Sequence, residues 1–349
     1  MITRTAFNTR HIVAALTLAI VGAYASAAEL TVVNFGGSWG QVQKPAFYDP
    51  FEKSTGDKIT VVEYNGESAK VKAMVEAKAV NWDVVEVESG ELNRGCDDGL
   101  YEVLDWSKIA KKSDLVQGAA QKCGVGFVVW SMAGAYNADK LKTAPTSWAD
   151  FWDVKKFPGK RGMRKGARYN LEFALMADGV APKDVYKVLD TKAGQDRAFK
   201  KLDELKPNIQ WWEAGAQPPQ FLVAGDVVMS TAFNGRIDAA RREGQNLKVM
   251  WNGSILDQDY WTIPKGTPNK ALAEQFIAYT LTAKPQQAFT QRIAYGPANL
   301  ATLKSLDSTT LSNLPNSPTN AKNSVLQDIG FWTDHGEELE QRFAAWASK

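Results

Sequence analysis

Histidine is nearly absent from the sequence, and this limits the chemistry that the chain can perform. Of the two histidines, His11 lies in the first 28 residues and His335 lies near the C-terminus. A Ser-His-Asp triad, an imidazole general base and a multi-histidine zinc site are therefore nearly excluded. The glycine-rich loop that holds phosphates in P-loop proteins is also missing. Because lysine- or carboxylate-based catalysis has no positive signal either, we expect a protein that is not an enzyme and that holds no metal or cofactor.

Long apolar runs are missing after residue 28, whereas the first 28 residues have the features of an export signal. Arg4 and Arg10 form a positive region, residues 12–23 are apolar, and Ala25-Ser26-Ala27 supplies the small residues that signal peptidase requires. This pattern predicts a secretory signal peptide over residues 1–28, cleaved near Ala27-Ala28, and a periplasmic location. A buried N-terminal helix is the alternative. The rest of the chain contains no run of membrane-spanning length, so we expect a soluble protein.

Cysteine is as scarce as histidine. Cys96 and Cys123 are the two cysteines of the chain. In an exported protein, an even pair most simply forms one disulfide bond, although two free buried thiols are the alternative.

A strong net charge is also lacking, since 41 basic side chains face 39 acidic ones. Loss of Arg4 and Arg10 with the signal peptide would bring the formal charge from +2 to 0. A neutral chain of mixed sign argues against nucleic acid or an anionic membrane as a partner. We therefore expect a small-molecule partner and a monomeric protein.

The first third of the mature chain alternates between strand and helix patterns. Apolar strands are expected at residues 29–35, 58–64 and 82–87, with helices at roughly 42–55 and 68–79 between them. This alternation predicts a mostly parallel sheet with helices on both faces, and about 320 mature residues suggest two lobes. Ligands of such sheets bind beyond the C-terminal ends of the strands. That rule selects two loops, the tight turn at 36–40, which contains Ser38 and Trp39, and Glu88-Ser89-Gly90.

Six short motifs follow one another in a distinctive order: NFGGSWG, WDVVEVESGEL, SWADFWD with FPGKRGM, FLVAGDVVMSTAFNGR, DYWTIPKGTPNKALAEQFIAYTL and AYGPAN. Their order and spacing resemble the periplasmic solute-binding proteins of ABC importers, and most closely the spermidine/putrescine-type branch of polyamine- and 4-aminobutyrate-binding proteins. The resemblance extends over essentially the whole mature chain.

The resemblance implies a two-lobed α/β fold, the type II periplasmic binding protein fold, in which each lobe has a mixed, mostly parallel sheet flanked by helices. It assigns residues 29–136 and 260–302 to the first lobe, and residues 137–259 and 303–349 to the second lobe. It also implies that the lobes close on a ligand and deliver it to a membrane permease and its ATPase, without catalysis.

Several ligand-binding residues follow from the resemblance, position by position. It implies an aromatic side chain at Trp39, a polar contact at Ser89, an aromatic before the Asn-Gly pair at Phe233, and an aromatic turn residue at Tyr295. It implies that Asp259 holds an amine of the ligand.

Two departures from the polyamine pattern change the expected ligand. Near the start of the helix at 170–179, Arg168 and Tyr169 stand where polyamine binders place acids, and Arg236 follows the Asn-Gly pair directly. A guanidinium group is a bidentate partner for a carboxylate, and a helix start favours an anionic ligand. Arg236 is therefore the expected carboxylate ligand, with Arg168 and Tyr169 in reserve. A surface arginine paired with Asp226 or Asp238 is the alternative for Arg236.

Further candidates come from the same loops. Asp257 competes with Asp259 for the amine, and the aromatic residues would surround an alkyl chain and attract a cation. For each aromatic residue, packing in the core is an equally good interpretation. The remaining candidates that we expect at the site are Ser38, Trp212 and Tyr260.

Opposite charges among aromatic residues predict a ligand that carries both signs. The sequence thus predicts the periplasmic capture of a small ω-amino acid such as 4-aminobutyrate for import. Alternatives are a polyamine, then an opine, then a secreted enzyme on the same fold.

Overall fold

The computed structural model describes residues 1, 3, 27–64 and 66–349. The predicted signal peptide therefore lies almost entirely outside the described residues, as does the side chain of Ser38. Within the described ranges, no helix is both long and apolar enough to cross a membrane.

The described residues form a ten-stranded mixed sheet. Its main order is β2-β1-β3-β8-β4-β7-β5-β6, with β10 paired to β8 and β9 paired to β4. The strands are β1 (Glu29–Asn34), β2 (Lys58–Glu63), β3 (Val84–Glu88), β4 (Gly124–Asn137), β5 (Arg161–Arg164), β6 (Ile209–Trp212), β7 (Met229–Phe233), β8 (Leu247–Thr262), β9 (Gly296–Pro297) and β10 (Val325–Leu326).

The helices surround this sheet. They are α1 (Gly37–Gln43), α2 (Asp49–Thr55), α3 (Ser68–Glu76), α4 (Ser89–Asp97), α5 (Trp106–Ile109), α6 (Trp148–Trp152), α7 (Asn170–Ala177), α8 (Val185–Leu189), α9 (Lys192–Leu205), α10 (Gln217–Ala224), α11 (Asn234–Arg242), α12 (Lys270–Thr280), α13 (Ala283–Thr290), α14 (Leu300–Ser305), α15 (Ser308–Ser312) and α16 (Ile329–Ala347). A π-helical turn over Lys44–Tyr48 joins α1 to α2.

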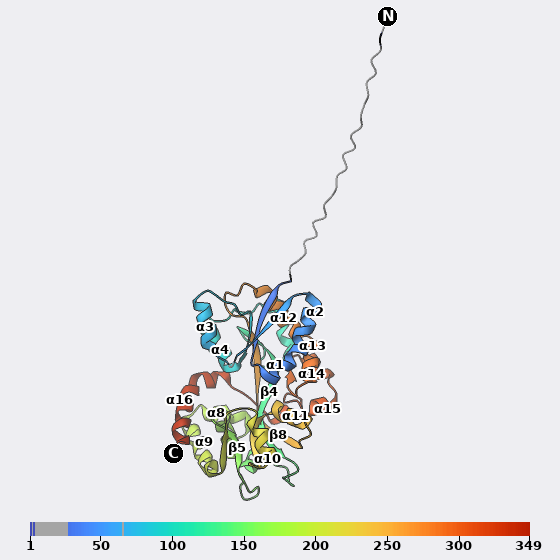
Figure 1. Ribbon diagram of the computed structural model, residues 1–349. Helices are drawn as coiled ribbons and strands as arrows, with labels where there is room; N and C mark the ends of the chain where they lie inside the picture. Colours follow the sequence, from blue (N-terminus) through green and yellow to red (C-terminus); the bar gives the residue numbers. More distant parts are fainter. Residues whose placement is uncertain (2, 4–26, 65) are drawn as a thin grey trace.

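Two lobes lie one above the other in Figure 1, and the long strands β4 and β8 run between them. The upper, first lobe contains the parallel strands β1 to β3 with α2, α3, α4, α12 and α13, and the lower, second lobe contains β5 to β7 with α8, α9 and α10. The C-terminal half of β4 pairs with β7, and the C-terminal end of β8 pairs with β3. Each long strand thus belongs to both lobes, and the predicted residue limits of the lobes stay a prediction.

The first of the two long strands, β4, is apolar almost throughout. In β4, thirteen of the fourteen side chains are buried, which fits a strand that is covered on both faces. β4 and β8 pair antiparallel along nearly their whole length, with irregularities between Gly126 and Val128 and between Met132 and Gly134. Such bulges bend a strand and increase its twist, so the lobes meet at an angle around these positions.

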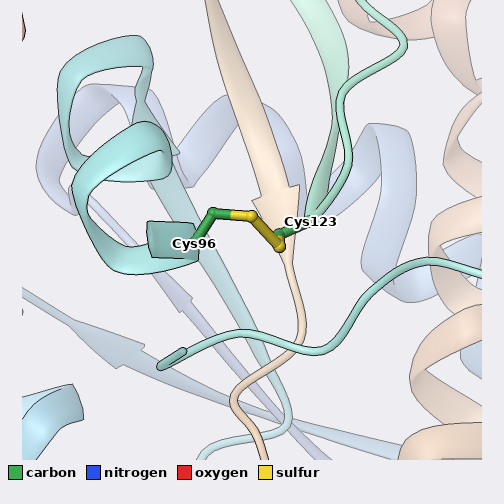
Figure 2. The surroundings of a disulfide bond; sticks show 2 residues. All are labelled: Cys96 and Cys123. Carbon is green, nitrogen blue, oxygen red and sulfur yellow. A yellow bond between two sulfur atoms is a disulfide. The ribbon is translucent and has the colours of Figure 1, made fainter. Parts of the chain in front are cut away.

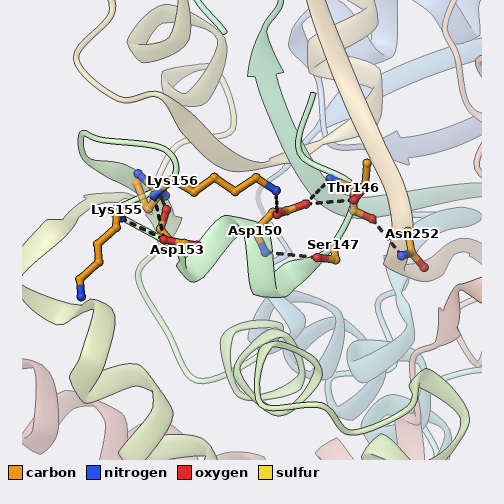
Figure 3. A network of polar contacts seen from close by, with 8 residues as sticks. Thr146, Ser147, Asp150, Asp153, Lys155, Lys156 and Asn252 are labelled. Carbon is orange, nitrogen blue, oxygen red and sulfur yellow. Dashed lines mark hydrogen bonds and ion pairs between the residues drawn. The ribbon is translucent and has the colours of Figure 1, made fainter. Parts of the chain in front are cut away.

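The second lobe begins with a short helix, α6, that is fixed by polar contacts at both ends (Figure 3). Ser147 Oγ accepts a hydrogen bond from the backbone N–H of Asp150, while the Asp150 carboxylate accepts from the N–H of Thr146 and from Lys156 Nζ. Asn252 Nδ2 donates to the carbonyl of Thr146 and so ties this start to β8. These caps satisfy backbone groups that a five-residue helix cannot pair internally.

The sequence predicts a tight turn at 36–40, and the turn in the structure is shorter. Positive φ angles of 65° and 56° are confined to Gly36 and Gly37, and α1 begins at Gly37. The hydroxyl of Tyr48 and the amide of Gln43 both contact Asn34 behind the turn, so the residues after Gly37 are held in a helix against β1. Trp39 therefore projects from a helix rather than from a loop.

A disulfide bond joins Cys96, near the end of α4, to Cys123, directly before β4 (Figure 2). The two Cα atoms lie 5.7 Å apart, and 27 positions separate the residues in the chain. Since α4 starts directly after Glu88, the bond holds the helix that follows β3 against the first long strand.

Replacing Cys96 and Cys123 together by serine should lower the free energy of unfolding by about 3 kcal/mol, because the unfolded chain regains the freedom of the opened loop. Denaturant titration of the two proteins measures this difference. A reducing agent should weaken the wild-type protein to the same degree and leave the double-serine variant unchanged. Equal stability of wild type and variant under oxidising conditions would show that the bond contributes nothing.

Candidate functional site

The ends of several strands meet at one small cavity between the lobes. Its volume is about 190 Å³, below the range of cavities that bind drug-sized molecules. The first lobe contributes residues that follow β1, end β3 and precede β9, while the second lobe contributes the end of β7 and the start of α11. The lining residues are Phe35, Trp39, Glu88, Trp130, Gly215, Phe233, Arg236, Asp259, Ile293 and Tyr295.

Both signs of charge line this cavity. Arg236 is the third residue of α11, which the second lobe supplies after β7. Glu88 and Asp259 face each other in the antiparallel pairing of β3 and β8. Burial raises the pKa of Tyr295, while the nearby charge of Arg236 lowers it and the charges of Asp259 and Glu88 raise it, so this phenol lies within electrostatic reach of both signs. A molecule in the cavity would therefore meet a cation from one lobe and carboxylates from β3 and β8.

Asp259 belongs to a buried group of acids. Its Oδ1 accepts a hydrogen bond from Trp130 Nε1 at 2.9 Å, and it is hydrogen-bonded to Glu86. Burial and the neighbouring charges of Glu86 and Glu88 raise the pKa of Asp259 well above its ordinary value. Burial likewise raises the pKa of Glu86 to about 8. A cation in the cavity would favour the ionised form of these carboxyls.

Glu86 also positions an aromatic side chain of the cavity. It accepts hydrogen bonds from Trp39 Nε1 at 2.7 Å and from Gln43 Nε2 at 2.8 Å. The ring of Trp39 is thereby fixed with its centroid 5.2 Å from that of Tyr295.

A second pair of aromatic rings lies on the side of the second lobe. The centroids of Trp130 and Phe233 are 5.3 Å apart, in an edge-to-face arrangement. Together with Trp39 and Tyr295, these rings give the cavity apolar surfaces that suit methylene groups and attract a cation through their faces.

Five predicted site residues line the cavity, namely Trp39, Phe233, Arg236, Asp259 and Tyr295. Six others do not. Ser89 and Asp257 lie behind Glu88, where Ser89 Oγ donates a hydrogen bond to Asp257 Oδ2 at 3.0 Å. Tyr260 follows Asp259 in a strand and therefore points to the opposite face, where its hydroxyl donates to the carbonyl of Gly118.

The other three residues support the cavity from outside. Trp212 packs edge-to-face on Phe233 and donates from Nε1 to Thr231 Oγ1 at 3.2 Å. Tyr169 is buried, with its ring centroid 6.4 Å from that of Trp130. Arg168 lies beside Gly90 at the start of α4. The twelfth candidate, Ser38, has a side chain outside what the structure describes.

Glu88 lies in the loop Glu88-Ser89-Gly90, which the strand-end rule selects, and it lines the cavity, although it was not among the predicted ligand-binding residues. In the stretch Val85-Glu86-Val87-Glu88 the acids alternate with valines, so both acids point to one face of β3. Two acids on one face of an otherwise apolar strand could have been recognised as a polar site. The other missed residues, Phe35, Trp130, Gly215 and Ile293, have no such signal because they read as ordinary core or loop residues.

A substitution of Asp257 tests how a buried carboxyl beside the cavity changes the stability of the protein with pH. Burial raises its pKa from 3.8 to about 7, so any contribution of this group to stability is present at low pH and is lost as the pH rises through 7. Asp257→Asn keeps the acceptor for the N–H of Gln258, and the Ser89 hydroxyl can rotate to accept from the new amide. The ligand-free variant should therefore gain stability over wild type between pH 4 and pH 7, by at least about 1 kcal/mol at pH 7. Thermal unfolding across this pH range measures the stability of both proteins. The same pH dependence of stability in variant and wild type would contradict the expectation.

The chain is similar to known proteins over nearly its whole length. The family model described as bacterial extracellular solute-binding protein matches residues 46–318. The gamma-aminobutyric acid-binding protein of Pseudomonas aeruginosa is 56% identical over 327 residues, which cover 94% of this chain and 93% of that protein.

Two solved structures agree with the sequence matches. An ABC transporter substrate-binding protein from Bradyrhizobium japonicum USDA 110 is 36% identical, with a TM-score of 0.85 over 91% of this chain and 99% of its own. The structure described as the Atu4243-GABA receptor is 34% identical, with a TM-score of 0.83 over 92% of this chain and 98% of its own. These matches confirm the predicted two-lobed fold class and the predicted family: the chain belongs to the bacterial extracellular solute-binding proteins.

Proposed function

We propose that this solute-binding protein captures 4-aminobutyrate, a small ω-amino acid, and passes it to the permease and ATPase of an ABC importer. The observation that carries the proposal is that Arg236 and two carboxylates, Glu88 and Asp259, line one cavity of about 190 Å³. The similarity to proteins described as binding gamma-aminobutyric acid supports the same ligand. The role is binding and delivery, not catalysis.

In the proposed complex, each end of the ligand meets its opposite charge. Arg236 binds the carboxylate in bidentate fashion, and the N-terminus of α11 adds its own attraction for an anion. Asp259 and Glu88 bind the ammonium group, assisted by the faces of the aromatic rings. The three methylene groups lie between Trp39 and Tyr295 on one side and Phe233 on the other.

Binding is proposed to stabilise the closed arrangement of the lobes, because the ligand contacts residues of both. Contacts between the second lobe and the segment before β9 support this view. Asn234 Nδ2, at the start of α11, donates a hydrogen bond to the carbonyl of Ala294, and Arg242 Nη1 donates to the carbonyl of Gln291 at 3.1 Å. An open form would lose these contacts, and the ligand would restore them.

The alternatives fit the cavity less well. A diamine such as putrescine would bring a second ammonium group toward Arg236, and like charges in a cavity of low dielectric constant repel strongly. An opine combines an amino acid with a second large group, for which about 190 Å³ leaves little space. Residues 1–28 are proposed to be the export signal, cleaved near Ala27-Ala28, and the protein is proposed to act as a periplasmic monomer.

Arg236→Ala should weaken 4-aminobutyrate binding by about 2–5 kcal/mol, because the ligand carboxylate would be buried without its cation. Isothermal titration calorimetry measures the change. Arg241→Ala is the matched control, since Arg241 lies on the same helix, bonds to Asn313 and does not line the cavity. Equal effects of the two substitutions would rule out the proposed role of Arg236.

Fragments of the ligand separate the two charge contacts without any mutation. Butanoate lacks the ammonium group and butylamine lacks the carboxylate, so each leaves buried charges of the site unpaired and should bind at least about 100-fold more weakly than 4-aminobutyrate. Putrescine should also bind more weakly than 4-aminobutyrate. Competition experiments in which butylamine or putrescine bound as tightly as 4-aminobutyrate would favour the polyamine alternative.

A further inference from the structure

Arg168 lies between the lobes but outside the ligand cavity. It belongs to the loop that joins β5 to α7 in the second lobe, and its side chain reaches the start of α4 in the first lobe. A β-carbon at Gly90 would lie 3.3 Å from Nη2 of Arg168, so the absence of a side chain at Gly90 leaves room for the guanidinium group.

The loop that carries Arg168 is firmly attached to α16. The Glu340 carboxylate accepts hydrogen bonds from the backbone N–H groups of Ala167 at 2.8 Å and of Arg168 at 3.1 Å. The Trp332 ring lies 5.6 Å from Cζ of Arg168, in a cation–π contact. Trp332 is itself fixed, because its Nε1 donates to Glu172 on α7 at 2.8 Å. The guanidinium group is therefore held in place by α16 and, through Trp332, by α7.

The charges around the guanidinium group are mainly negative. Burial lowers the pKa of Arg168, but the neighbouring Tyr169 and the charges of Glu88, Asp257 and Glu91 outweigh burial and raise it. Glu88 and Glu91 belong to the first lobe, at the end of β3 and the start of α4. Burial and the charge of Glu88 raise the pKa of Glu91, which shows that these acids repel each other. Arg168 thus adds a second cation beside these acids, since Arg94 already pairs with Glu91 at 3.4 Å.

We propose that Arg168 is a positioning residue that stabilises the closed form, because its guanidinium group crosses from the second lobe to the start of α4 at Gly90. This inference rests on the proposed function of the cavity. Arg168 contacts no ligand. It meets the start of α4 and the acids of the first lobe only when the lobes are closed. Opening of the lobes separates the cation from these acids, so Arg168 favours closure on the ligand.

Arg168→Gln tests the proposal, because it removes the charge and keeps a polar side chain of similar reach. We expect the Kd for 4-aminobutyrate to rise about tenfold, mainly through faster dissociation. Arg168→Lys should restore part of this loss because it returns the charge. Lys165→Gln is the matched control, since Lys165 lies on the same loop, pairs with the exposed Glu213 at 3.0 Å and should leave the Kd unchanged.

A second substitution distinguishes a role of charge from a role in packing. Glu91→Gln removes one of the repelling acids and lies outside the cavity lining. When Glu91→Gln is added to Arg168→Gln, the Kd should fall at least threefold relative to Arg168→Gln alone. If Arg168→Gln acts only through lost packing around Trp332, the Kd should not respond to the charge of Glu91. An unchanged Kd in Arg168→Gln, or a loss that is the same with and without Glu91→Gln, would overturn the proposal.

Small-angle X-ray scattering separates this inference from the choice of ligand. Arg168→Gln, or Arg168→Lys if the glutamine variant does not fold, should be more open on average than wild type without any ligand. If wild type fails to bind 4-aminobutyrate, the proposed ligand is wrong, and the scattering comparison still decides on Arg168. Identical scattering profiles of the folded variant and wild type would contradict the inference.

Discussion

The site depends on bringing opposite charges from different parts of the fold to one small cavity that is lined by aromatic rings. Arg236 comes from the second lobe, whereas Glu88 and Asp259 come from two paired strands, and all three line one cavity. In such a space the Coulomb interaction is much stronger than in water, and an unpaired charge is costly. The protein compensates for part of this cost by the hydrogen bond from Trp130 Nε1 to Asp259. A zwitterion of matching length would provide the rest.

The fold supplies these charges from elements that are far apart in the chain. β3 and β8 place Glu88 and Asp259 opposite each other, although 170 positions separate them in the sequence. The β7–α11 junction brings Arg236 toward them from the other lobe. Because β4 and β8 run through both lobes, a change of angle between the lobes can widen the cavity without disrupting either half of the sheet. Recognition and closure are thus properties of the same arrangement.

The sequence predicts the fold class well, because strand and helix alternate clearly up to residue 88 and the motif order resembles a known family. It also identifies Arg236 and Asp259, since charged residues among aromatics at a strand end are conspicuous. It selects the loop Glu88-Ser89-Gly90 but favours Ser89 over Glu88 as the ligand-binding residue, because the direction of a side chain depends on the pairing of β3 with β8, which is a long-range property. For the same reason Tyr260, next to Asp259 in the chain, points to the opposite face. Arg168 was predicted as a reserve ligand, and its place beside Gly90 follows from the contact between α4 and the loop before α7, which no local pattern encodes.

A crystal structure of the protein with 4-aminobutyrate tests the central claim most directly. The account predicts ligand density in the cavity between Trp39 and Phe233, with the carboxylate within hydrogen-bonding distance of the Arg236 guanidinium group and the nitrogen beside Asp259 and Glu88. Density for the ligand outside this cavity, or in the reverse orientation with its nitrogen beside Arg236, would contradict it.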